Sequence, residues 1–520
     1  MTQLNDELIR KETIQLANDG PTVHTTKYET KVPTLHKSYL LFFSLIISAL
    51  TIAVPFFTDA ANSLQSQNLY IGMMLTKGQI PYSDVFTTGG LLYFVVIALS
   101  YYLGTTLWLV FVQAFCFYLS GLYLYKLINY FTSFQKVALA FSIGYYVLSL
   151  GLGFGGLYPI QLAMPFVLVS AWFLTKYFAD LIKDEAFILF GFMGALSMLI
   201  EPRTLIFWVL ACVTVLVYNI HQKHLARGFY QLLASVWGMI LVFYTAGYFI
   251  LNLQILNPYL AQAVAYQFTF FRVGSLSLPL GVGIQIFLAL GLGLLTGVFS
   301  FIKQLKTSSD VVIKWLFTFV ILGNLIVAAL SQDYQPYNLL AVLPFGLILT
   351  AIPIGQRYEL DLGQRSHRRH RGSRTGVGRV LSLYLKKHFY LPFVLLLAAI
   401  AYPSYHTITS MATNQERSHI ASYLQQQLDG HQPIYVWDDT SKIYLESKAK
   451  SVSQFSSPNV NTKKVSHQKI LEDELLENEA VYIVVNQKMK LPTILRNMLS
   501  SNYKIDQKID VKGFTLYHKK

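Results

Sequence analysis

Long apolar runs separated by short polar segments make up about the first four-fifths of the chain. An apolar helix needs roughly 20 residues to cross the hydrocarbon core of a bilayer. By this measure the pattern predicts about eleven membrane-spanning helices, at residues 38–57, 105–125, 137–155, 159–176, 186–202, 204–220, 231–251, 279–302, 313–331, 336–354 and 389–409. The expected fold class is a polytopic α-helical membrane protein that carries a small C-terminal α/β domain.

One apolar run, residues 89–103, is too short to be counted among the spans. Runs of this length are more often interfacial or re-entrant than spanning. When it is left out, Lys and Arg fall in alternate loops, as the positive-inside rule requires. The short outside loops then hold only Lys77, Arg203 and Arg272. This orientation predicts a cytoplasmic tail (1–37), a transmembrane domain (38–409) with an outer-surface loop and interfacial helix (58–104), a basic cytoplasmic loop (355–388) and an extracytoplasmic domain (410–520).

The predicted cytoplasmic loop 355–388 is rich in Arg, Gly and Ser. Such a segment is typical of a flexible linker that stays near anionic lipid headgroups. A site for a specific partner is the alternative, and the sequence alone leaves both open.

From about residue 410 the composition becomes that of a soluble domain. Alternating and continuous apolar patterns predict strands at 431–437 and 480–485 and a terminal hairpin within 503–518. Helical patterns cover 420–428 and 469–478. Asp438 and Asp439 follow the first strand, where ligands often bind in α/β folds, although a solvated turn is the simpler interpretation.

The overall composition supports a membrane protein: 53% of the residues are hydrophobic and only 13% are charged. The net charge of +14 is better explained by cytoplasmic loops than by nucleic-acid binding. Cys116 and Cys212 both lie in apolar spans, so we expect core residues rather than a disulfide or a metal site. The first apolar run is long enough to span, which predicts a retained anchor rather than a cleaved signal peptide.

Two carboxylates flank the predicted outer-surface loop. Asp59 follows the first span, and Asp84 precedes the short apolar run. One of them could accept a proton from an incoming hydroxyl as a general base, and the other could orient the acceptor or hold a metal. Each could also be a solvated helix cap, a role for which Asp is well suited.

The outside cations suggest a phosphate site. Arg203 lies in the sequence Glu201-Pro202-Arg203 between two apolar runs, and the planar guanidinium matches phosphate oxygens well. Lys77 and Arg272 could join it around a lipid-linked phosphate. A local Glu201–Arg203 ion pair is the alternative.

A late Tyr-rich loop and one tyrosine of the surface segment are candidate substrate-binding groups. Their side chains suit hydrogen bonds to a sugar or a phosphate, although Tyr is also common at membrane interfaces. The candidates are Tyr82, Tyr334, Gln335, Tyr337 and Asn338.

Taken in order, these features resemble the GT-C superfamily of membrane glycosyltransferases, in particular bacterial relatives of protein O-mannosyltransferases and of the aminoarabinose transferase of lipid A. The resemblance rests on Asp59 after the first span, on the segment Gly78-Gln79-Ile80-Pro81-Tyr82-Ser83-Asp84-Val85-Phe86 followed by Gly89-Gly90, on Gly194 to Arg203, and on Tyr334-Gln335-Pro336-Tyr337-Asn338 before a span containing Pro344.

The resemblance implies that 38–409 is a catalytic domain. It would transfer a sugar, with inversion, from a polyprenyl-phosphate donor to a glycan, lipid or protein at the outer face. Asp59 is the first choice for the base and Asp84 the second, with Arg203, Arg272 and Lys77 holding the phosphate. No cofactor is certain and a divalent metal remains open. A surface-polysaccharide polymerase or ligase and a non-enzymatic lipid-linked glycan transporter are the alternatives.

Overall fold

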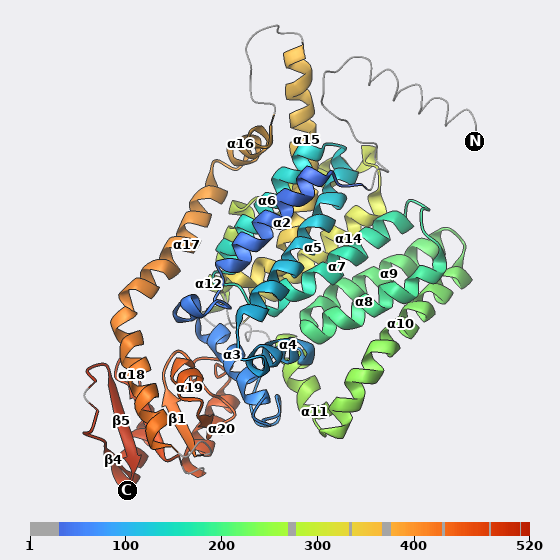
Figure 1. Cartoon of the computed structure of the whole chain (residues 1–520). Helices are drawn as coiled ribbons and strands as arrows, with labels where there is room; N and C mark the ends of the chain where they lie inside the picture. Colours follow the sequence, from blue (N-terminus) through green and yellow to red (C-terminus); the bar gives the residue numbers. More distant parts are fainter. Residues whose placement is uncertain are drawn as a thin grey trace.

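The structure, a computed structural model, describes residues 31–268, 277–331, 335–366, 376–428, 432–477, 480–509 and 511–520. A bundle of long helices occupies most of it, and a small mixed α/β domain lies at one end of the bundle (Figure 1). This arrangement confirms the predicted fold class.

Each predicted span overlaps a helix of the bundle. The long helices are α2 (Thr34–Ala49), α5 (Leu107–Thr132), α6 (Gln135–Leu152), α7 (Pro159–Tyr177), α8 (Phe187–Ile200), α9 (Leu205–His221), α10 (Leu225–Asn252), α12 (Ser277–Gly291), α13 (Thr296–Lys303), α14 (Val311–Leu330), α15 (Leu343–Ser366) and α17 (Leu391–Thr409). Shorter pieces connect them: α11 (Leu256–Tyr259), α16 (Val377–Lys387), and the short segments η1 (Pro55–Ala60), η2 (Asp184–Ala186), η3 (Pro202–Thr204), η4 (Leu260–Val264), η5 (Ala265–Phe268), η6 (Leu305–Thr307) and η7 (Pro336–Ala341).

Among the described residues, seven helices are long and apolar enough to cross a membrane, or eight if α12 and α13, bent by 72°, form one span. The chain is therefore a multi-pass membrane protein. The predicted number of eleven is not confirmed, partly because α2 has 16 residues and α8 has 14, fewer than a straight span needs.

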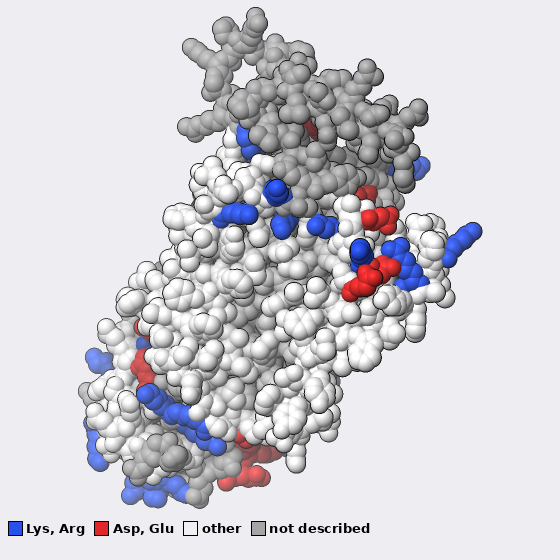
Figure 2. Space-filling model, turned by 45° about the vertical axis from the view of Figure 1, so that its right-hand side comes forward, with Lys and Arg blue, Asp and Glu red and all other residues white. Residues whose placement is uncertain are grey.

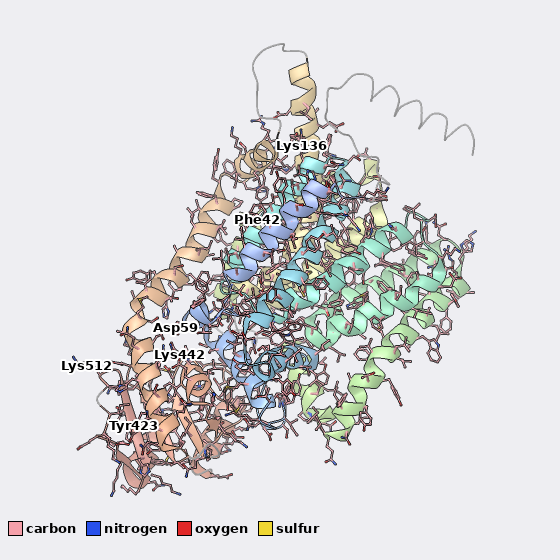
Figure 3. All side chains as sticks on the ribbon, in the orientation of Figure 1. Phe42, Asp59, Lys136, Tyr423, Lys442 and Lys512 are labelled. Carbon is pink, nitrogen blue, oxygen red and sulfur yellow. The ribbon has the colours of Figure 1, made fainter. Side chains whose placement is uncertain are left out.

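The bundle presents apolar side chains outward. Phe42 on α2 is 58% exposed (Figure 3) and Trp237 on α10 is 59% exposed. Figure 2 shows a broad band without charged side chains between the far end of the bundle and the α/β domain. Such a surface is stable where lipid rather than water covers it.

The segment after α2 forms two short helices, α3 (Ser63–Leu75) and α4 (Leu91–Tyr102). The 12 residues of α4 span only about 18 Å, too little to cross the hydrocarbon core. The interfacial position of this run stays a prediction, as do the cytoplasmic and extracytoplasmic assignments of the termini.

The C-terminal domain has a five-stranded sheet in the order β2-β1-β3-β5-β4. Its strands are β1 (Pro433–Trp437), β2 (Lys450–Ser451), β3 (Tyr482–Asn486), β4 (Tyr503–Ile505) and β5 (Phe514–Lys519), and its helices are α18 (Met411–Gln427), α19 (Lys442–Ser447), α20 (Val465–Glu477) and α21 (Thr493–Asn502). The strands β1, β2 and β3 are parallel, and β5 runs antiparallel to β3 and β4. The carboxyl ends of β1 and β3 therefore lie side by side.

Candidate active site

Residues 58–104, here called the surface segment, lie between the bundle and the C-terminal domain (Figure 1). Backbone N–H groups of that domain donate to α3 side chains: Ser441 to the Ser66 hydroxyl at 3.0 Å and Ser451 to the Tyr70 hydroxyl at 2.9 Å. Ser66 and Tyr70 are four residues apart, which places them on the same face of the helix. The helix α3 thus joins the two parts of the molecule.

A cavity of about 460 Å³, here called the polar cavity, opens where the bundle, the surface segment and the C-terminal domain meet. Its polar and charged lining residues are Asn62, Ser63, Asn68, Thr88, Tyr158, Glu201, Arg203, Tyr266, Gln267, Ser331, Gln335, Tyr337, Asn338, Asn459, Asn461 and Lys463. The predicted candidates Arg203, Gln335, Tyr337 and Asn338 are therefore brought together.

Pro202 places Glu201 and Arg203 at this cavity. The residue before a proline avoids the helical region, and Glu201 is extended (φ −139°, ψ 101°), which ends α8. Pro202 then opens the one-turn segment η3, where its missing N–H costs nothing. The Glu201 carboxylate accepts a hydrogen bond from the Arg203 backbone N–H at 3.2 Å.

The Arg203 guanidinium is held from two sides. Its Nε lies 3.1 Å from Oε1 of Glu201, and its Nη2 lies 3.2 Å from Oε2. Its Nη1 donates to Oδ1 of Asn338 at 3.2 Å. The Glu201 side chain is only 1% exposed, whereas that of Arg203 is 17% exposed. The predicted local ion pair is present, and the arginine also lines the polar cavity.

Two helix N-termini meet at the polar cavity. Asn62 caps α3 by accepting from Gln65 N–H at 2.8 Å, and the Gln65 side chain accepts from Asn62 N–H at 3.1 Å. Asn62 also donates to the hydroxyl of Tyr158 at 2.8 Å, and Tyr158 is the N-cap of α7. Helix N-termini carry partial positive charge and favour anions.

Gly90 permits the surface segment to pack tightly behind Glu201. Its N–H donates to the Ile200 carbonyl at 3.1 Å. A Cβ at Gly90 would lie 2.1 Å from the Leu199 carbonyl oxygen, a distance that no side chain tolerates. The second glycine of the Gly89-Gly90 pair is therefore required by close approach of the backbone.

A second cavity of about 560 Å³, here called the amphipathic cavity, shares a wall with the first. One part is apolar and lies between α6, α12 and α17, where its lining includes Leu148, Leu152, Leu288, Leu292, Leu395 and Leu396. The other part is polar and is lined by Asp59, His406, Asn414, Arg417, Asp439 and Thr440. The residues common to both cavities are Asn62, Ser63, Tyr158, Gln335 and Tyr337. Tyr158 and Tyr337 stack in this wall, with ring centroids 4.7 Å apart.

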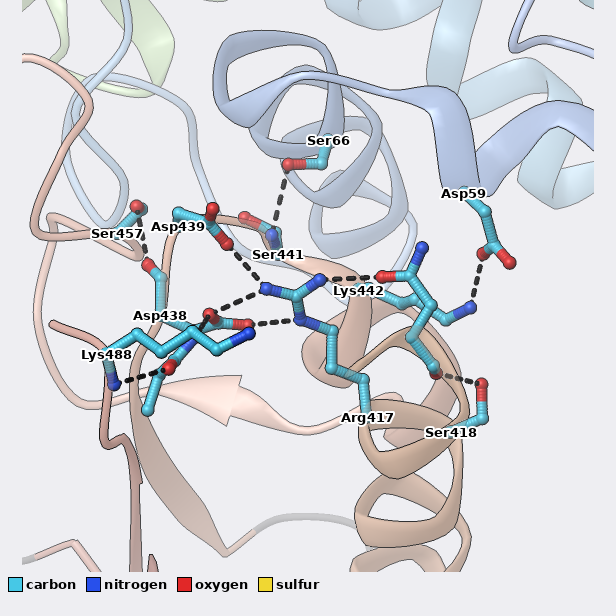
Figure 4. A network of polar contacts seen from close by, with 12 residues as sticks. Asp59, Ser66, Arg417, Ser418, Asp438, Asp439, Ser441, Lys442, Ser457 and Lys488 are labelled. Atoms are coloured by element: carbon cyan, nitrogen blue, oxygen red, sulfur yellow. Dashed lines mark hydrogen bonds and ion pairs between the residues drawn. The ribbon is translucent and has the colours of Figure 1, made fainter. Parts of the chain in front are cut away.

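Asp59 lines the amphipathic cavity rather than the polar one. Its carboxylate is 46% exposed and forms an ion pair with Lys442 of the C-terminal domain (Figures 3 and 4). Asp59 therefore precedes Asn62, a residue of the shared wall, by three positions in the sequence. It lines the amphipathic cavity and also contacts the C-terminal domain through Lys442.

The pair Asp438-Asp439 is not a solvated turn. The Asp438 side chain is fully buried and accepts from Arg417 Nε at 2.7 Å, while Arg417 Nη2 also contacts Asp439 at 2.6 Å (Figure 4). Asn486, at the end of β3, donates to Asp438 at 2.7 Å. Burial, followed by the charge of Asp438, raises the pKa of Asp439. This network fills the carboxyl edge of the parallel strands, which the sequence identified as a possible ligand position.

Asp84 and Tyr82 form hydrogen bonds within the turn that precedes α4, and neither these two residues nor Lys77 line either cavity. The Asp84 carboxylate accepts from Ile80 N–H at 2.9 Å. The buried Tyr82 donates to the Gly89 carbonyl at 2.8 Å. Lys77 donates to the carbonyl of Lys448 in the C-terminal domain. Arg272 and Tyr334 lie outside the described residues.

Several cavity residues were not predicted. The capping pattern Asn62-x-x-Gln65 could have identified Asn62. Tyr158 and Lys463 reach the cavity only through the tertiary fold, and no sequence pattern marks them. Within the described part of the chain, no group of three or more His, Cys, Asp or Glu side chains could hold a metal ion.

Comparison with known proteins agrees with this architecture. Residues 25–411 match the family model described as "Putative competence-induced protein Ccs4 N-terminal domain", and residues 414–520 match that of the Ccs4 C-terminal domain. A comparison with curated proteins found no similar sequence.

Two solved structures have the same fold. The crystal structure of ArnT from Cupriavidus metallidurans bound to undecaprenyl phosphate has a TM-score of 0.55 and 11% identity, over 92% of this chain and 98% of that one. The apo structure of the same protein has a TM-score of 0.54 and 11% identity, over 93% and 97%. This likeness confirms the GT-C type of fold that the sequence resembled.

Proposed function

We propose that this chain, which belongs to the competence-induced Ccs4 family, is a membrane glycosyltransferase that takes a sugar from a polyprenyl phosphate. The ArnT structure with undecaprenyl phosphate supports this donor class through a shared fold. The acceptor would be a glycan, a lipid or a protein at the outer face of the membrane.

The observation that carries the proposal is the shared wall between the two cavities. A polyprenyl-phosphate sugar has an anionic, hydroxyl-rich head and a long apolar tail. The polar cavity offers Arg203 and two helix N-termini to the phosphate. The amphipathic cavity offers an apolar passage between α6, α12 and α17, where the first isoprene units could leave toward the bilayer.

The proposed reaction is a direct displacement at the anomeric carbon. The acceptor oxygen forms the new glycosidic bond as the bond from that carbon to the phosphate oxygen breaks, and polyprenyl phosphate leaves. A carboxylate takes the proton of the acceptor hydroxyl. Arg203, with Lys77 and Arg272 as further candidates, would stabilise the negative charge that develops on the departing phosphate.

Asp59 remains the proposed base and Asp84 the second choice. Asp59 lines the amphipathic cavity close to the shared wall, so an acceptor held there could reach its carboxylate. Asp84 is bound to the backbone of its own turn, which favours a positioning role unless that turn opens. Among the described residues that line the polar cavity, Glu201 is the one carboxylate. The activity of a Glu201 variant should therefore be compared with the activity of an Asp59 variant.

The test is the composition and linkage of cell-surface glycans in a deletion strain. The strain is complemented with wild type, Arg203→Ala, Asp59→Asn, Asp84→Asn or, as a control, Arg496→Ala on the exposed face of α21. We expect one sugar substituent to disappear on deletion and to return with wild type and Arg496→Ala, but not with Arg203→Ala or Asp59→Asn. An unchanged glycan profile in the deletion strain, under conditions where the protein is normally made, would favour a transporter.

A further inference from the structure

The C-terminal domain reaches the amphipathic cavity through α18 and through the segment that follows β1. Arg417 of α18 lines the cavity, and so do Asp439 and Thr440 of that segment. The membrane domain contributes Asp59 in η1 and His406 near the end of α17 to the same polar part of the lining. Both domains therefore build this part of the cavity.

Asp439 is held in place from both directions along the chain. Its neighbour Asp438 is buried and accepts a hydrogen bond from Arg417 Nε at 2.7 Å. Two residues after Asp439, the Ser441 N–H donates to the Ser66 hydroxyl of α3 at 3.0 Å. Asp439 thus has a fixed position between the carboxyl edge of the sheet and the surface segment.

The two adjacent carboxylates differ in exposure. The Asp438 side chain is fully buried, whereas 39% of the Asp439 side chain is exposed. Asp438 accepts hydrogen bonds from both Nε and Nη2 of Arg417 (Figure 4), so the buried guanidinium has an ionic partner without Asp439. The exposed part of the Asp439 carboxylate is therefore available to a molecule in the cavity that it lines.

Arg417 places a hydrogen-bond donor beside this acceptor. Its Nη2 donates to Asp439 Oδ1 at 2.6 Å, and its Nη1 donates to Asn414 Oδ1 at 2.6 Å. Nη1 carries a second hydrogen, and no acceptor for it is found in the part of the chain that the structure describes. A carboxylate and a guanidinium thus lie next to each other in the lining of the cavity.

The charges around this pair favour a neutral partner. Burial lowers the pKa of Arg417, whereas its hydrogen bond to Asp438 raises it, and the charges of the neighbouring carboxylates make the net shift upward. Asp439 and Asp59 are both among these carboxylates, so both lie close to the guanidinium. An anionic group would meet the two carboxylates, and a cationic group would meet the guanidinium. A hydroxyl group avoids both conflicts, because it can donate to the carboxylate and accept from the guanidinium.

We propose that Asp439, oriented by Arg417, binds a hydroxyl group of the acceptor in the polar part of the amphipathic cavity, while a neighbouring hydroxyl reacts at Asp59. This inference rests on the proposed function and deepens it: the acceptor carries several hydroxyl groups, as a glycan or a polyol chain does, and the C-terminal domain positions it. A hydroxyl of the donor sugar has the same chemistry, and the test separates the two sources.

The experiment measures sugar transfer by the purified full-length protein in vesicles, with lipid extract of the deletion strain as donor and its cell envelope as acceptor. One substrate is varied while the other is saturating. Asp439→Ala should raise the half-saturating amount of cell envelope about tenfold or more, the range expected for loss of a hydrogen bond to a charged group. The maximal rate and the half-saturating amount of donor should stay close to those of wild type.

Two further variants separate substrate binding from a structural role. Asp439→Asn keeps an oxygen that accepts from Arg417, so it should raise the half-saturating amount of cell envelope less than Asp439→Ala does. Asp473→Ala removes an exposed carboxylate of α20; it is the matched control and should behave as wild type. A fall in the maximal rate alone, together with a lower unfolding temperature, would make Asp439 a structural residue and overturn the inference.

The remaining outcomes distinguish this inference from the proposed function. If Asp439→Ala raises the half-saturating amount of donor instead, the residue binds the donor sugar and the assignment to the acceptor is overturned. Transfer to protein side chains rather than to a glycan or a polyol chain would overturn the acceptor class. If both half-saturating amounts equal those of wild type while Arg203→Ala loses transfer, the inference about Asp439 is wrong and the proposed function stands. If wild type transfers no sugar, the proposed function itself is wrong.

Discussion

Arg203 and Glu201 form a two-point ion pair around Pro202, with Nε and Nη2 of the guanidinium at 3.1 and 3.2 Å from the two carboxylate oxygens. The carboxylate is buried and the guanidinium is partly exposed at the polar cavity. Glu201 therefore fixes the orientation of Arg203, and Asn338 holds the remaining nitrogen. A guanidinium oriented in advance loses little side-chain entropy when it binds phosphate.

This pair predicts that stability and activity can be separated. Arg203→Ala leaves a buried carboxylate without its cationic partner, which should lower the free energy of unfolding by about 3–5 kcal/mol. Adding Glu201→Gln should recover much of that stability, because the neutral amide costs less to bury. Activity should stay at least tenfold low in both variants. Thermal unfolding in detergent and a transfer assay check this, and recovery of activity in the double variant would show that Arg203 serves the fold alone.

The contact between Asp59 and Lys442 predicts a different pattern. The pair is partly exposed, so its loss should change stability by about 1 kcal/mol or less. If Asp59 is the base, Asp59→Asn should lower the transfer rate by at least about 100-fold, while Lys442→Ala should have a much smaller effect. The transfer rates and unfolding temperatures of the two single variants and of the double variant distinguish a catalytic base from a contact between domains. Equal, modest losses in the two single variants would make Asp59 a contact between domains and not a base.

Gly90 gives a prediction about how the surface segment positions Glu201. Gly90→Ala forces a methyl group against the Leu199 carbonyl and should destabilise the protein by about 1–3 kcal/mol while lowering activity. Gly144→Ala is the control, since nothing lies within 4 Å of a Cβ at that position in α6, and alanine favours a helix over glycine. Unfolding temperature and transfer rate should fall only for Gly90→Ala. Equal behaviour of the two variants would contradict the close packing.

We expect His467, which stacks on Tyr266 of η5, to make the attachment of the C-terminal domain sensitive to pH. Burial lowers the pKa of its ring from the usual 6.5; the hydrogen bond to the Asn461 carbonyl raises it, and the charge of Lys464 lowers it. The folded state therefore favours the neutral ring. This contribution to stability is present above pH 6.5 and is lost as the pH falls through the lower pKa of the folded state.

The measurement is limited proteolysis of the loop between β2 and α20 at pH 7.5 and at pH values below 6.5. Cleavage should accelerate in acid for wild type and less so for His467→Gln, which can donate to the Asn461 carbonyl without titrating near neutral pH. A pH dependence as large in His467→Gln as in wild type would assign the effect to another group.

The sequence predicts the helices and strands better than the tertiary contacts between them. The eleven expected spans all overlap helices because apolar runs of this length have few alternative structures, and β1 and β3 follow from continuous apolar patterns. The short strand β2 and the helices α19 and α21 were not predicted: a two-residue strand carries too little pattern, and α19 and α21 are also short.

The candidate site likewise contains residues that the sequence predicts and residues that only the tertiary structure brings together. Arg203 could be predicted because a charge between two apolar runs needs a partner or a ligand, and Asn338 followed from the polar loop before α15. Lys463 could not be predicted, since it lies 260 residues beyond Arg203 in the sequence and meets the same cavity only through docking of the C-terminal domain. The sequence ranks Asp59 above Asp84 as the base through the family resemblance alone, and the structure gives the two carboxylates different surroundings.

The proposed transferase activity is tested by the release of free undecaprenyl phosphate from lipid-linked sugars by the purified protein in vesicles. Lipid extracts of the deletion strain supply the donor, its cell envelope supplies the acceptor, and mass spectrometry follows the free lipid phosphate and the glycosylated product. We expect equal amounts of the two products with wild type and Arg496→Ala, and at least a tenfold loss with Arg203→Ala. Donor consumption that is as fast with Arg203→Ala as with wild type, or no release by wild type at all, would contradict it.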